Sequence, residues 1–270
     1  MRHRSFAALA LAAVASLGLA ACSGGSTSSD ANTIVVGATP SPHAKILNYI
    51  NDNLAADAGI KIKVVEYTDY VQPNTALNDG DLDANFYQTV PYLENAEKQF
   101  GYDFEAGEGI HLEPLGVFSN KHKSLDELPD GGTIGIISDT ANQSRALELL
   151  ATQGLVSIPE GGGDVNINTV TKLKNFKFRE VEGPQLVRLL DDYDYAVING
   201  NFAQEGGKSI SSDALVVESP VDNPAVNVLV WKNGSSKAEA IAKLEQLLHS
   251  DEVKQYIEQT WPDGSVIPAF

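Results

Sequence analysis

The sequence predicts an α/β fold. Short runs rich in β-branched residues alternate with amphipathic helical patterns from residue 33 to the end of the chain. Residues that favour helix starts precede several of these patterns, and glycines follow them. The segment 33–270 is long enough to bury a sizeable core, either in one large domain or in two lobes.

The first 21 residues have the organisation of an export signal. Arg2 and Arg4 supply positive charge, and an apolar run from Phe6 to Ala21 follows, interrupted only by Ser16. This run has about 16 residues, fewer than the ~20 that a membrane-spanning helix needs. We therefore expect residues 1–21 to be a cleaved signal peptide.

Cys22 is the only cysteine of the chain and directly follows Leu19-Ala20-Ala21. The arrangement resembles a bacterial lipobox, in which the cysteine thiol is linked to a diacylglycerol and becomes the first residue of the mature protein. An ordinary signal followed by a chance cysteine is the alternative. A single cysteine excludes an intrachain disulfide framework. We expect lipidation at Cys22 and a flexible tether over residues 22–32, which are rich in Ser, Gly and Thr.

The mature chain is strongly acidic. Loss of Arg2 and Arg4 with the leader leaves 17 basic against 36 acidic side chains, a net charge near −19. Such a surface repels nucleic acid and anionic lipid headgroups. We therefore expect no nucleic-acid partner and a membrane contact that depends on the lipid.

Short segments rich in Val, Ile and aromatic residues are the strand candidates, and their order indicates a mainly parallel sheet. They are Thr33–Gly37, Lys61–Glu66, Ala84–Phe86, Leu115–Ser119, Thr133–Ile137, Phe176–Val181, Tyr195–Ile198, Leu215–Val217 and Val226–Trp231.

Helix signals lie between these strands. Ser41-Pro42 opens a pattern that places Ile46, Leu47, Ile50 and Leu54 on one face and ends at Gly59. Capping boxes are predicted at Thr140–Gln143, before a helix closed by Gly154, and at Ser236–Glu239.

The motifs that would suggest catalysis or metal binding fail on inspection. Gly207-Lys208-Ser209 is not a phosphate-binding loop, because Phe202 occupies the position of its first glycine. The chain has neither a His-Glu-x-x-His nor a Gly-x-Ser-x-Gly sequence, and its histidines are scattered along the chain.

The acidic run Asp79, Asp81 and Asp83 has the spacing of a calcium loop. Its sixth and twelfth positions, however, are Ala84 and Val90, where glycine and glutamate are required. We therefore expect no metal, no cofactor and no enzymatic turnover.

Polar and aromatic residues gather where predicted strands end, which is where open α/β sheets bind ligands. Tyr70 follows one strand, Tyr87, Thr89 and Tyr92 lie where another passes into a helix, and Arg145 lies early in the helix after residue 139. Asn199 ends the strand Tyr195–Ile198, and Asn227 lies on Val226–Trp231.

These stretches resemble the NlpA-type methionine-binding lipoproteins. The resemblance covers essentially the whole mature segment in order and is carried by Val36–His43, Asp69–Asn74, Asp83–Phe86 with Val90–Tyr92, Asn142–Leu147, Ala196–Asn201 and Val226-Asn227. It implies a two-lobed periplasmic-binding-protein fold of type II that closes on an amino acid. It also implies a membrane permease and its ATPase as partners, and a lipid anchor on the extracytoplasmic face of the cell membrane.

The resemblance implies a role for each candidate residue. Arg145 would pair with the ligand carboxylate, Asn199 and Asn227 would bind its backbone polar groups, and the pocket for the side chain would be lined by Tyr70, Tyr87 and Tyr92. The chemistry agrees, since a guanidinium suits a carboxylate, amide oxygens accept from an ammonium, and a thioether packs well on aromatic rings.

The chain departs from the family pattern at two positions. Family members commonly carry histidine where this chain has Thr89, and phenylalanine where it has Tyr87. Both changes concern the side-chain pocket, so they bear on the expectation of methionine and not on that of amino-acid binding. The Tyr87 hydroxyl would favour a more polar ligand or replace the hydrogen bond of the missing histidine.

Each candidate also has a purely structural interpretation. Arg145 would be an exposed helix residue, Asn199-Gly200 an ordinary turn, the tyrosines packing residues, and Thr89 the cap of a helix begun at Pro91.

The resemblance predicts lobe 1 over residues 33–115 and 226–270, lobe 2 over 116–225, and a hinge near Pro114–Gly116 and Pro220–Ala225. Three alternatives to a methionine importer stay open. They are a binder of another amino acid or of a short methionine-containing peptide, a surface lipoprotein acting through protein partners, and a lipid-anchored hydrolase.

Overall fold

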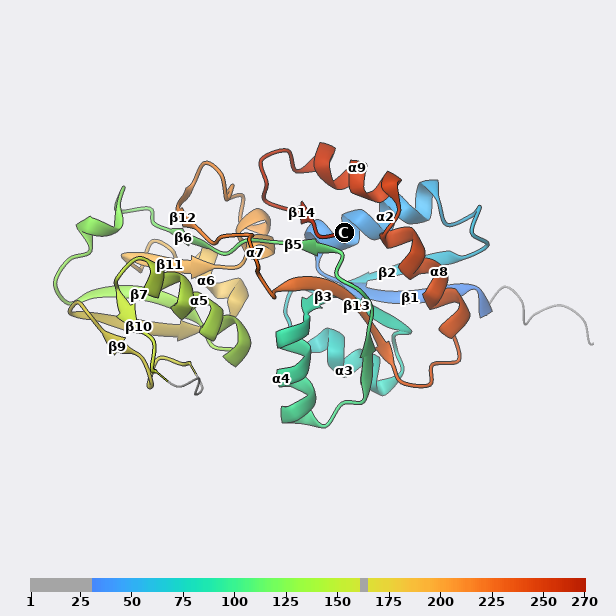
Figure 1. Ribbon diagram of the computed structural model, residues 1–270, viewed down its shortest axis with the longest axis horizontal. Coiled ribbons are helices and arrows are strands. Elements are labelled where there is room, and N and C mark those ends of the chain that lie inside the picture. Colours follow the sequence, from blue (N-terminus) through green and yellow to red (C-terminus); the bar gives the residue numbers. More distant parts are fainter. Residues whose placement is uncertain (1–30, 161–164) are drawn as a thin grey trace, which may run out of the picture.

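A computed structural model describes residues 31–160 and 165–270 and has two lobes, each built on its own β-sheet. Figure 1 shows the two sheets side by side along the long axis, with lobe 1 on the right and lobe 2 on the left. The predicted signal peptide, Cys22 and most of the tether lie outside the described residues. Within the part of the chain that is described, no helix is long and apolar enough to cross a membrane.

The sheet of lobe 1 has seven strands in the order β14-β5-β13-β3-β1-β2, with β4 paired to β13. Their bounds are β1 Thr33–Ala38, β2 Lys61–Glu66, β3 Ala84–Thr89, β4 Phe104–Ala106, β5 His111–Leu112, β13 Val226–Lys232 and β14 Ile267–Pro268.

Helices cover both faces of this sheet. The β1 side chains alternate, so that Ile34 and Val36 lie in one apolar cluster with α2, α8 and α9, while Val35 contacts a second cluster with α3 and α4. The bounds are η1 Pro40–Ala44, α2 Lys45–Asn53, α3 Gln72–Asp79, α4 Val90–Phe100, α8 Ala238–Leu248 and α9 Asp251–Thr260. Ile46, Leu47 and Ile50 of α2 are buried as predicted, but the helix ends at Asn53, before Gly59.

The sheet of lobe 2 has five strands in the order β10-β7-β11-β6-β12, and α5 packs on one face while α6 and α7 pack on the other. The strand bounds are β6 Gly116–Phe118, β7 Gly132–Ile137, β10 Phe176–Val181, β11 Tyr195–Ile198 and β12 Ala214–Val217. The helices are η2 Leu125–Glu127, α5 Thr140–Thr152, α6 Gly183–Arg188 and α7 Gly200–Glu205, and a separate ribbon joins β8 Val156–Ser157 to β9 Thr171–Lys172.

The expectation of mainly parallel sheets was wrong. The strands β1, β2 and β3 pair in parallel, as do β7, β10 and β11. The strands next to the crossings between the lobes, β5, β6, β12 and β13, pair antiparallel to their neighbours. Each sheet is mixed because the chain enters and leaves each lobe at these strands.

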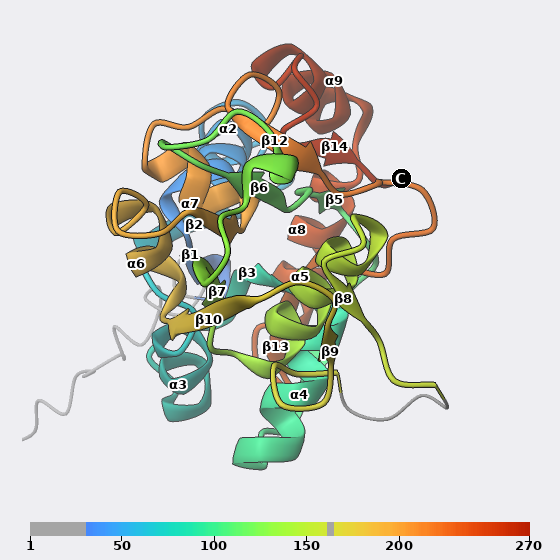
Figure 2. The same ribbon diagram turned by 90° about the vertical axis from the view of Figure 1, so that its left-hand side faces the viewer.

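The chain passes between the sheets twice, from β5 to β6 and from β12 to β13 (Figure 1). Figure 2, which views the molecule from the lobe 2 side, shows the two sheets one behind the other. The strands of each sheet fall within the ranges predicted for its lobe, while the boundary residues and the hinge positions stay predictions.

Both predicted capping boxes were wrong in detail. Helix α5 is capped by Asp139, whose carboxylate accepts the Asn142 backbone N–H at 2.9 Å, so the cap lies one residue before Thr140. Helix α8 begins after Lys237 without a side-chain cap. A capping box is a local pattern, and the neighbouring carboxylate of Asp139 is the better acceptor.

Candidate functional site

A narrow cavity lies between the lobes, and its free volume in this conformation is about 20 Å³. All seven residues predicted to bind ligand line it: Tyr70, Tyr87, Thr89, Tyr92, Arg145, Asn199 and Asn227. Lobe 1 contributes the loop after β2, the end of β3, the start of α4 and β13, whereas lobe 2 contributes α5 and the end of β11. Their roles in binding stay predictions.

The Arg145 guanidinium is already engaged on one side. Its Nε donates to Glu218 Oε1 at 2.7 Å, and its Nη2 donates to Glu218 Oε2 at 2.5 Å and to the Glu113 backbone carbonyl at 2.7 Å. Its Nη1 has no hydrogen-bond partner within residues 31–160 and 165–270. Arg145 therefore keeps two N–H donors for an incoming carboxylate while its charge is balanced by Glu218.

The asparagines of the cavity are held by their neighbours. Asn199 Nδ2 donates to Asn142 Oδ1 at 2.9 Å, and Asn227 Oδ1 lies 3.0 Å from His43 Nε2. Both asparagines are almost fully buried. Asn227 uses its side-chain oxygen on His43, so its N–H donors are left for the cavity. Asn199 uses a side-chain N–H on Asn142, so its oxygen is left.

Three tyrosines form one wall of the cavity. The hydroxyls of Tyr87 and Tyr92 both donate to the Tyr70 backbone carbonyl, at 2.9 and 2.8 Å. The Tyr70 ring lies 5.8 Å from each of the other two rings, measured between centroids. The Tyr87 hydroxyl, which departs from the family pattern, is therefore hydrogen-bonded to the protein backbone. This wall presents mainly aromatic surface to the cavity.

Thr89 caps α4 and also lines the cavity. Its side-chain oxygen accepts the Tyr92 backbone N–H at 3.4 Å, with Pro91 in the first turn of the helix. The capping interpretation is therefore confirmed, and a role toward ligand stays a prediction.

Sequence reasoning missed a buried polar cluster beside the cavity. His111 Nε2 lies 2.9 Å and His43 Nε2 lies 3.3 Å from the same oxygen, Glu113 Oε1. The two imidazole rings are 4.9 Å apart, so histidines that are distant in sequence meet in space.

Burial dominates the ionisation of this cluster. It lowers the pKa of His43 to about 4 and that of His111 to about 3, because a charged imidazolium loses its hydration. Burial raises the pKa of Glu113 to about 7, although the charges of His43 and Arg145 act in the opposite direction. Both histidines are therefore neutral near pH 7.

These three residues are the candidate metal-ligating group among the described residues, since their ligand atoms lie within 4.8 Å of one another. Hydrogen bonds account for His43 and for His111 Nε2 without an ion, whereas His111 Nδ1 has no hydrogen-bond partner among the described residues. The Thr39 hydroxyl lies 2.6 Å from His43 Nδ1 and can donate to it, which leaves the proton of the neutral ring on Nε2, 3.0 Å from its acceptor Asn227 Oδ1.

The other lining residues absent from the expected site are Gln88, Glu113, Asn142, Gly200 and Asn201. Three of them, Asn142, Gly200 and Asn201, lie inside motifs that carried the family resemblance. Glu113 had no such signal, because one glutamate before Pro114 looks like any surface acid until the fold buries it to 6% exposure.

Contacts between the lobes close the cavity on one side. Tyr70 donates its hydroxyl to Asn201 Oδ1 at 2.5 Å and stacks on Phe202, with 4.6 Å between ring centroids. Gln204 Oε1 accepts from the Ser41 hydroxyl at 2.9 Å and from the Trp261 indole N–H at 3.0 Å. In this conformation the lobes therefore contact each other over the cavity.

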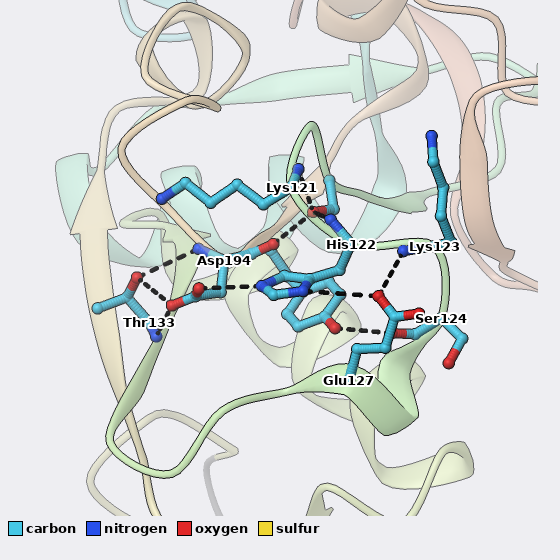
Figure 3. Close-up of polar contacts among 9 residues, drawn as sticks. Lys121, His122, Lys123, Ser124, Glu127, Thr133 and Asp194 are labelled. Atoms are coloured by element: carbon cyan, nitrogen blue, oxygen red, sulfur yellow. Dashed lines mark hydrogen bonds and ion pairs between the residues drawn. The ribbon is translucent and has the colours of Figure 1, made fainter.

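A second histidine site, in lobe 2, bears on the hydrolase alternative (Figure 3). His122 Nε2 lies 3.1 Å from Asp194 Oδ1, and its Nδ1 lies 3.6 Å from Glu127 Oε2. The other Asp194 oxygen accepts from Thr133, which joins β7 to β11. Both ring nitrogens of His122 thus face carboxylates, and only the Nε2 contact is within hydrogen-bond distance.

Comparison with known proteins agrees with this architecture. The profile of the NlpA lipoprotein family matches residues 34–270. The chain belongs to the NlpA lipoprotein family. A curated family member, the D-methionine-binding lipoprotein MetQ of Salmonella typhimurium, is 35% identical over 98% of each chain.

Two solved structures are similar to this chain in both sequence and fold. A structure from Actinomyces odontolyticus is 91% identical, with a TM-score of 0.87 over 88% of this chain and 99% of that one. A nutrient-binding protein from Burkholderia cenocepacia bound to methionine is 35% identical, with a TM-score of 0.83 over 88% of this chain and 100% of that one. This agreement confirms the predicted family and the two-lobed fold.

Proposed function

We propose that this protein is the substrate-binding component of an ABC importer and captures methionine between its two lobes. The observation that carries the proposal is a small cavity bounded by both lobes, in which Arg145 keeps unpaired N–H donors opposite an aromatic wall. A ligand that contacts both lobes stabilises the closed state selectively.

The two ends of methionine suit two groups of lining residues. Its carboxylate suits Arg145 Nη1 and the Asn227 amide, a charge-assisted contact worth roughly 1.5–3 kcal/mol. Its thioether packs on Tyr70, Tyr87 and Tyr92 for roughly 0.3–1.5 kcal/mol per contact. Such a wall discriminates weakly among apolar tails, so norleucine should bind within about 10- to 200-fold of methionine.

A short methionine-containing peptide is the second candidate, supported by a larger depression that adjoins the cavity. This depression, with a free volume of about 720 Å³, also includes Thr89, Asn142 and Arg145, and it extends past Asn95, Ser144 and Asn223. A ligand extended beyond its first carbonyl would pass Arg145 into this space.

The anchor and partners follow from the same proposal. Lipid on Cys22 and the tether to residue 32 would hold the domain at the extracytoplasmic face of the membrane, beside a permease and its ATPase. The acidic surface supports the lipid, rather than a basic patch, as the main membrane contact. Substrate capture requires no catalysis.

The direct test is mass spectrometry of the small molecule that denaturation releases from the purified mature protein, followed by methionine titration of the refolded protein. Recovery of methionine, with rebinding below micromolar and more favourable than about −8 kcal/mol, supports the proposal. Recovery of another amino acid or a peptide favours the second candidate. No released ligand and no heat from either class would support a lipoprotein that acts through protein partners.

A further inference from the structure

The outer end of lobe 2 carries a basic strip on an otherwise acidic molecule. The strip consists of Lys172, Lys174, Lys177 and Arg179, and no aspartate or glutamate occurs between residues 165 and 179. All four residues are exposed. The chain as a whole has a net charge of −17, so the sign of the surface charge is reversed locally.

The basic strip runs from β9 to β10, an edge strand of the lobe 2 sheet. In Figure 1 these strands lie at the left-hand end of the molecule, and β1, which follows the predicted tether, begins near the right-hand end. Figure 2 views the molecule from the end that carries the strip. The Leu173 N–H donates to the Leu155 carbonyl, and Lys172 Nζ donates to the Phe176 carbonyl, both at 2.9 Å. These bonds fix the strip to lobe 2, at the opposite end from the tether.

The cations of the strip are not neutralised by neighbouring acids. Lys174, Lys177 and Arg179 form no ion pair within residues 31–160 and 165–270. The carboxylate of Asp130, which lies beside the strip, accepts instead from the neutral amide of Asn175 at 2.9 Å. The three cations are therefore available to an external anion.

An exposed apolar side chain lies within the strip. Leu173 is 56% exposed, and it stands in the sequence between Lys172 and Lys174. A leucine flanked by lysines suits the surface of a lipid bilayer, because the apolar side chain enters between the headgroups while the ammonium groups stay at the level of the phosphates.

Protection of the sheet edge does not account for this pattern. Lysines on an edge strand discourage pairing with another chain. The opposite edge strand of the same sheet, β12 at Ala214–Val217, carries no charged residue within its bounds. Edge protection also gives no reason for an exposed leucine between two lysines.

We propose that the basic strip, together with Leu173, binds the anionic headgroups of the membrane to which the lipid anchor attaches the protein. The inference rests on the proposed lipid at Cys22 and is independent of methionine capture. The protein then has two membrane contacts at opposite ends, and its long axis lies along the membrane surface.

The negative charge of the whole molecule does not prevent this contact. At an ionic strength of 0.1 M, charges are screened beyond about 10 Å, so the acidic groups on the far side of the lobe act weakly on a surface that touches the strip. A weak local attraction is sufficient, because a tether holds the domain near the membrane at an effective concentration of roughly millimolar. The lipid remains the main contact, and the strip orients the domain.

A chemical footprint tests the contact without any variant. The lipidated mature protein is inserted into vesicles of phosphatidylcholine, alone or with phosphatidylglycerol, and treated with an amine-reactive reagent. Mass spectrometry then gives the labelling rate of each lysine. On the anionic vesicles, labelling of Lys174 and Lys177 should fall about 5-fold or more, whereas Lys61 and Lys63 of lobe 1, which are also exposed, should change less than about 2-fold.

Two triple variants of equal charge separate a local contact from a general charge effect. One changes the strip residues Lys174, Lys177 and Arg179 to Gln, and the other changes the exposed lobe 1 residues Lys61, Lys63 and Lys98 to Gln.

The position of lobe 2 is measured by energy transfer from a dye at Gln153→Cys to an acceptor lipid. Gln153 is exposed and lies two residues before Leu155, which bonds to Leu173. On anionic vesicles the strip variant should lower the ratio of bound to free lobe 2 about 10-fold or more, and the control variant less than about 2-fold. Salt at about 1 M should act like the strip variant, because the Debye length falls to roughly 3 Å.

Equal labelling on neutral and anionic vesicles would overturn the proposal, and so would equal energy transfer by the two triple variants. An intact mass without lipid on Cys22 would refute the anchor and the second contact with it. None of these results affects methionine titration in solution, and a protein that binds no methionine would leave the footprint unchanged.

Discussion

Arg145 and Glu218 form a two-pronged ion pair at the edge of the cavity, with Nε–Oε1 and Nη2–Oε2 distances of 2.7 and 2.5 Å. Each side chain is 13% exposed. Glu218 also accepts the Leu115 backbone N–H at 3.0 Å, so the carboxylate joins both chain crossings between the lobes. It orients the guanidinium so that Nη1 remains for ligand.

The first prediction concerns this pair. In Glu218→Gln an N–H2 group replaces one of the two oxygens that face Arg145, which leaves part of a buried charge unpaired. We expect the free energy of unfolding to fall by about 1–3 kcal/mol and methionine affinity to fall about 10-fold or more. Urea unfolding and calorimetry measure the two effects. Glu239→Gln, at an exposed ion pair with Lys243, should change stability by less than about 0.5 kcal/mol. If the two variants show the same stability and the same methionine affinity, Glu218 does not orient Arg145 for the ligand.

The second prediction concerns the Tyr87 hydroxyl. Because it donates to the Tyr70 carbonyl, which Tyr92 also binds, Tyr87→Phe should cost about 0.5–1.5 kcal/mol of stability. Methionine affinity should change less than about 3-fold, since the aromatic surface remains. A large loss of affinity, or a switch toward polar amino acids in a ligand panel, would show that the hydroxyl contacts the ligand.

The third prediction concerns acid stability. The pKa of His43 in the folded protein is lowered to about 4, so the unfolded chain binds more protons from about pH 6.5 downward. Stability from this group is therefore full above pH 6.5 and is lost as the pH falls toward 4. The raised pKa of Glu113 acts in the opposite direction between about pH 4.5 and 7.

His43→Gln removes the histidine titration but retains a donor for Asn227. Its unfolding free energy, measured in urea at pH 7, 6, 5 and 4, should decline less steeply than that of the wild-type protein. Parallel curves would contradict the neutral, buried state of His43.

The fourth prediction concerns the contact between the lobes at Gln204. Gln204→Ala removes the acceptor of the Ser41 hydroxyl and the Trp261 indole N–H. The ligand-free protein should then populate more open conformations, and the apparent affinity should fall about 3- to 10-fold. Small-angle X-ray scattering should give a larger radius of gyration, which saturating methionine restores. The exposed Gln153→Ala serves as the control, and unchanged scattering by Gln204→Ala would argue against a closing role.

Much of the fold was predictable because strand and helix signals are local. The strands Lys61–Glu66, Phe176–Val181 and Tyr195–Ile198 occur at the predicted residues. Strand direction was not predictable, because antiparallel pairing by β6 and β13 depends on how the chain crosses between lobes. The two-residue strands β5 and β14 carry too few side chains for a period to appear.

The candidate site was partly predictable for the same reason. Residues at the ends of predicted strands, such as Tyr70 and Asn199, reach the cavity because such ends converge at one edge. The His43–Glu113–His111 cluster combines η1 with the crossing segment after β5, and no sequence spacing encodes that proximity. Likewise, the pairing of Arg145 with Glu218 appears only when α5 packs beside the second crossing.

The most direct test of amino-acid capture between the lobes is a calorimetric titration of L-methionine into the wild-type mature protein and into Arg145→Ala under identical conditions. The account predicts submicromolar binding with a stoichiometry of one for the wild-type protein and at least about 100-fold weaker binding for the variant, with both proteins folded by circular dichroism. Equal affinity of the two proteins would contradict the account, because the ligand would then bind without the cation that faces the cavity.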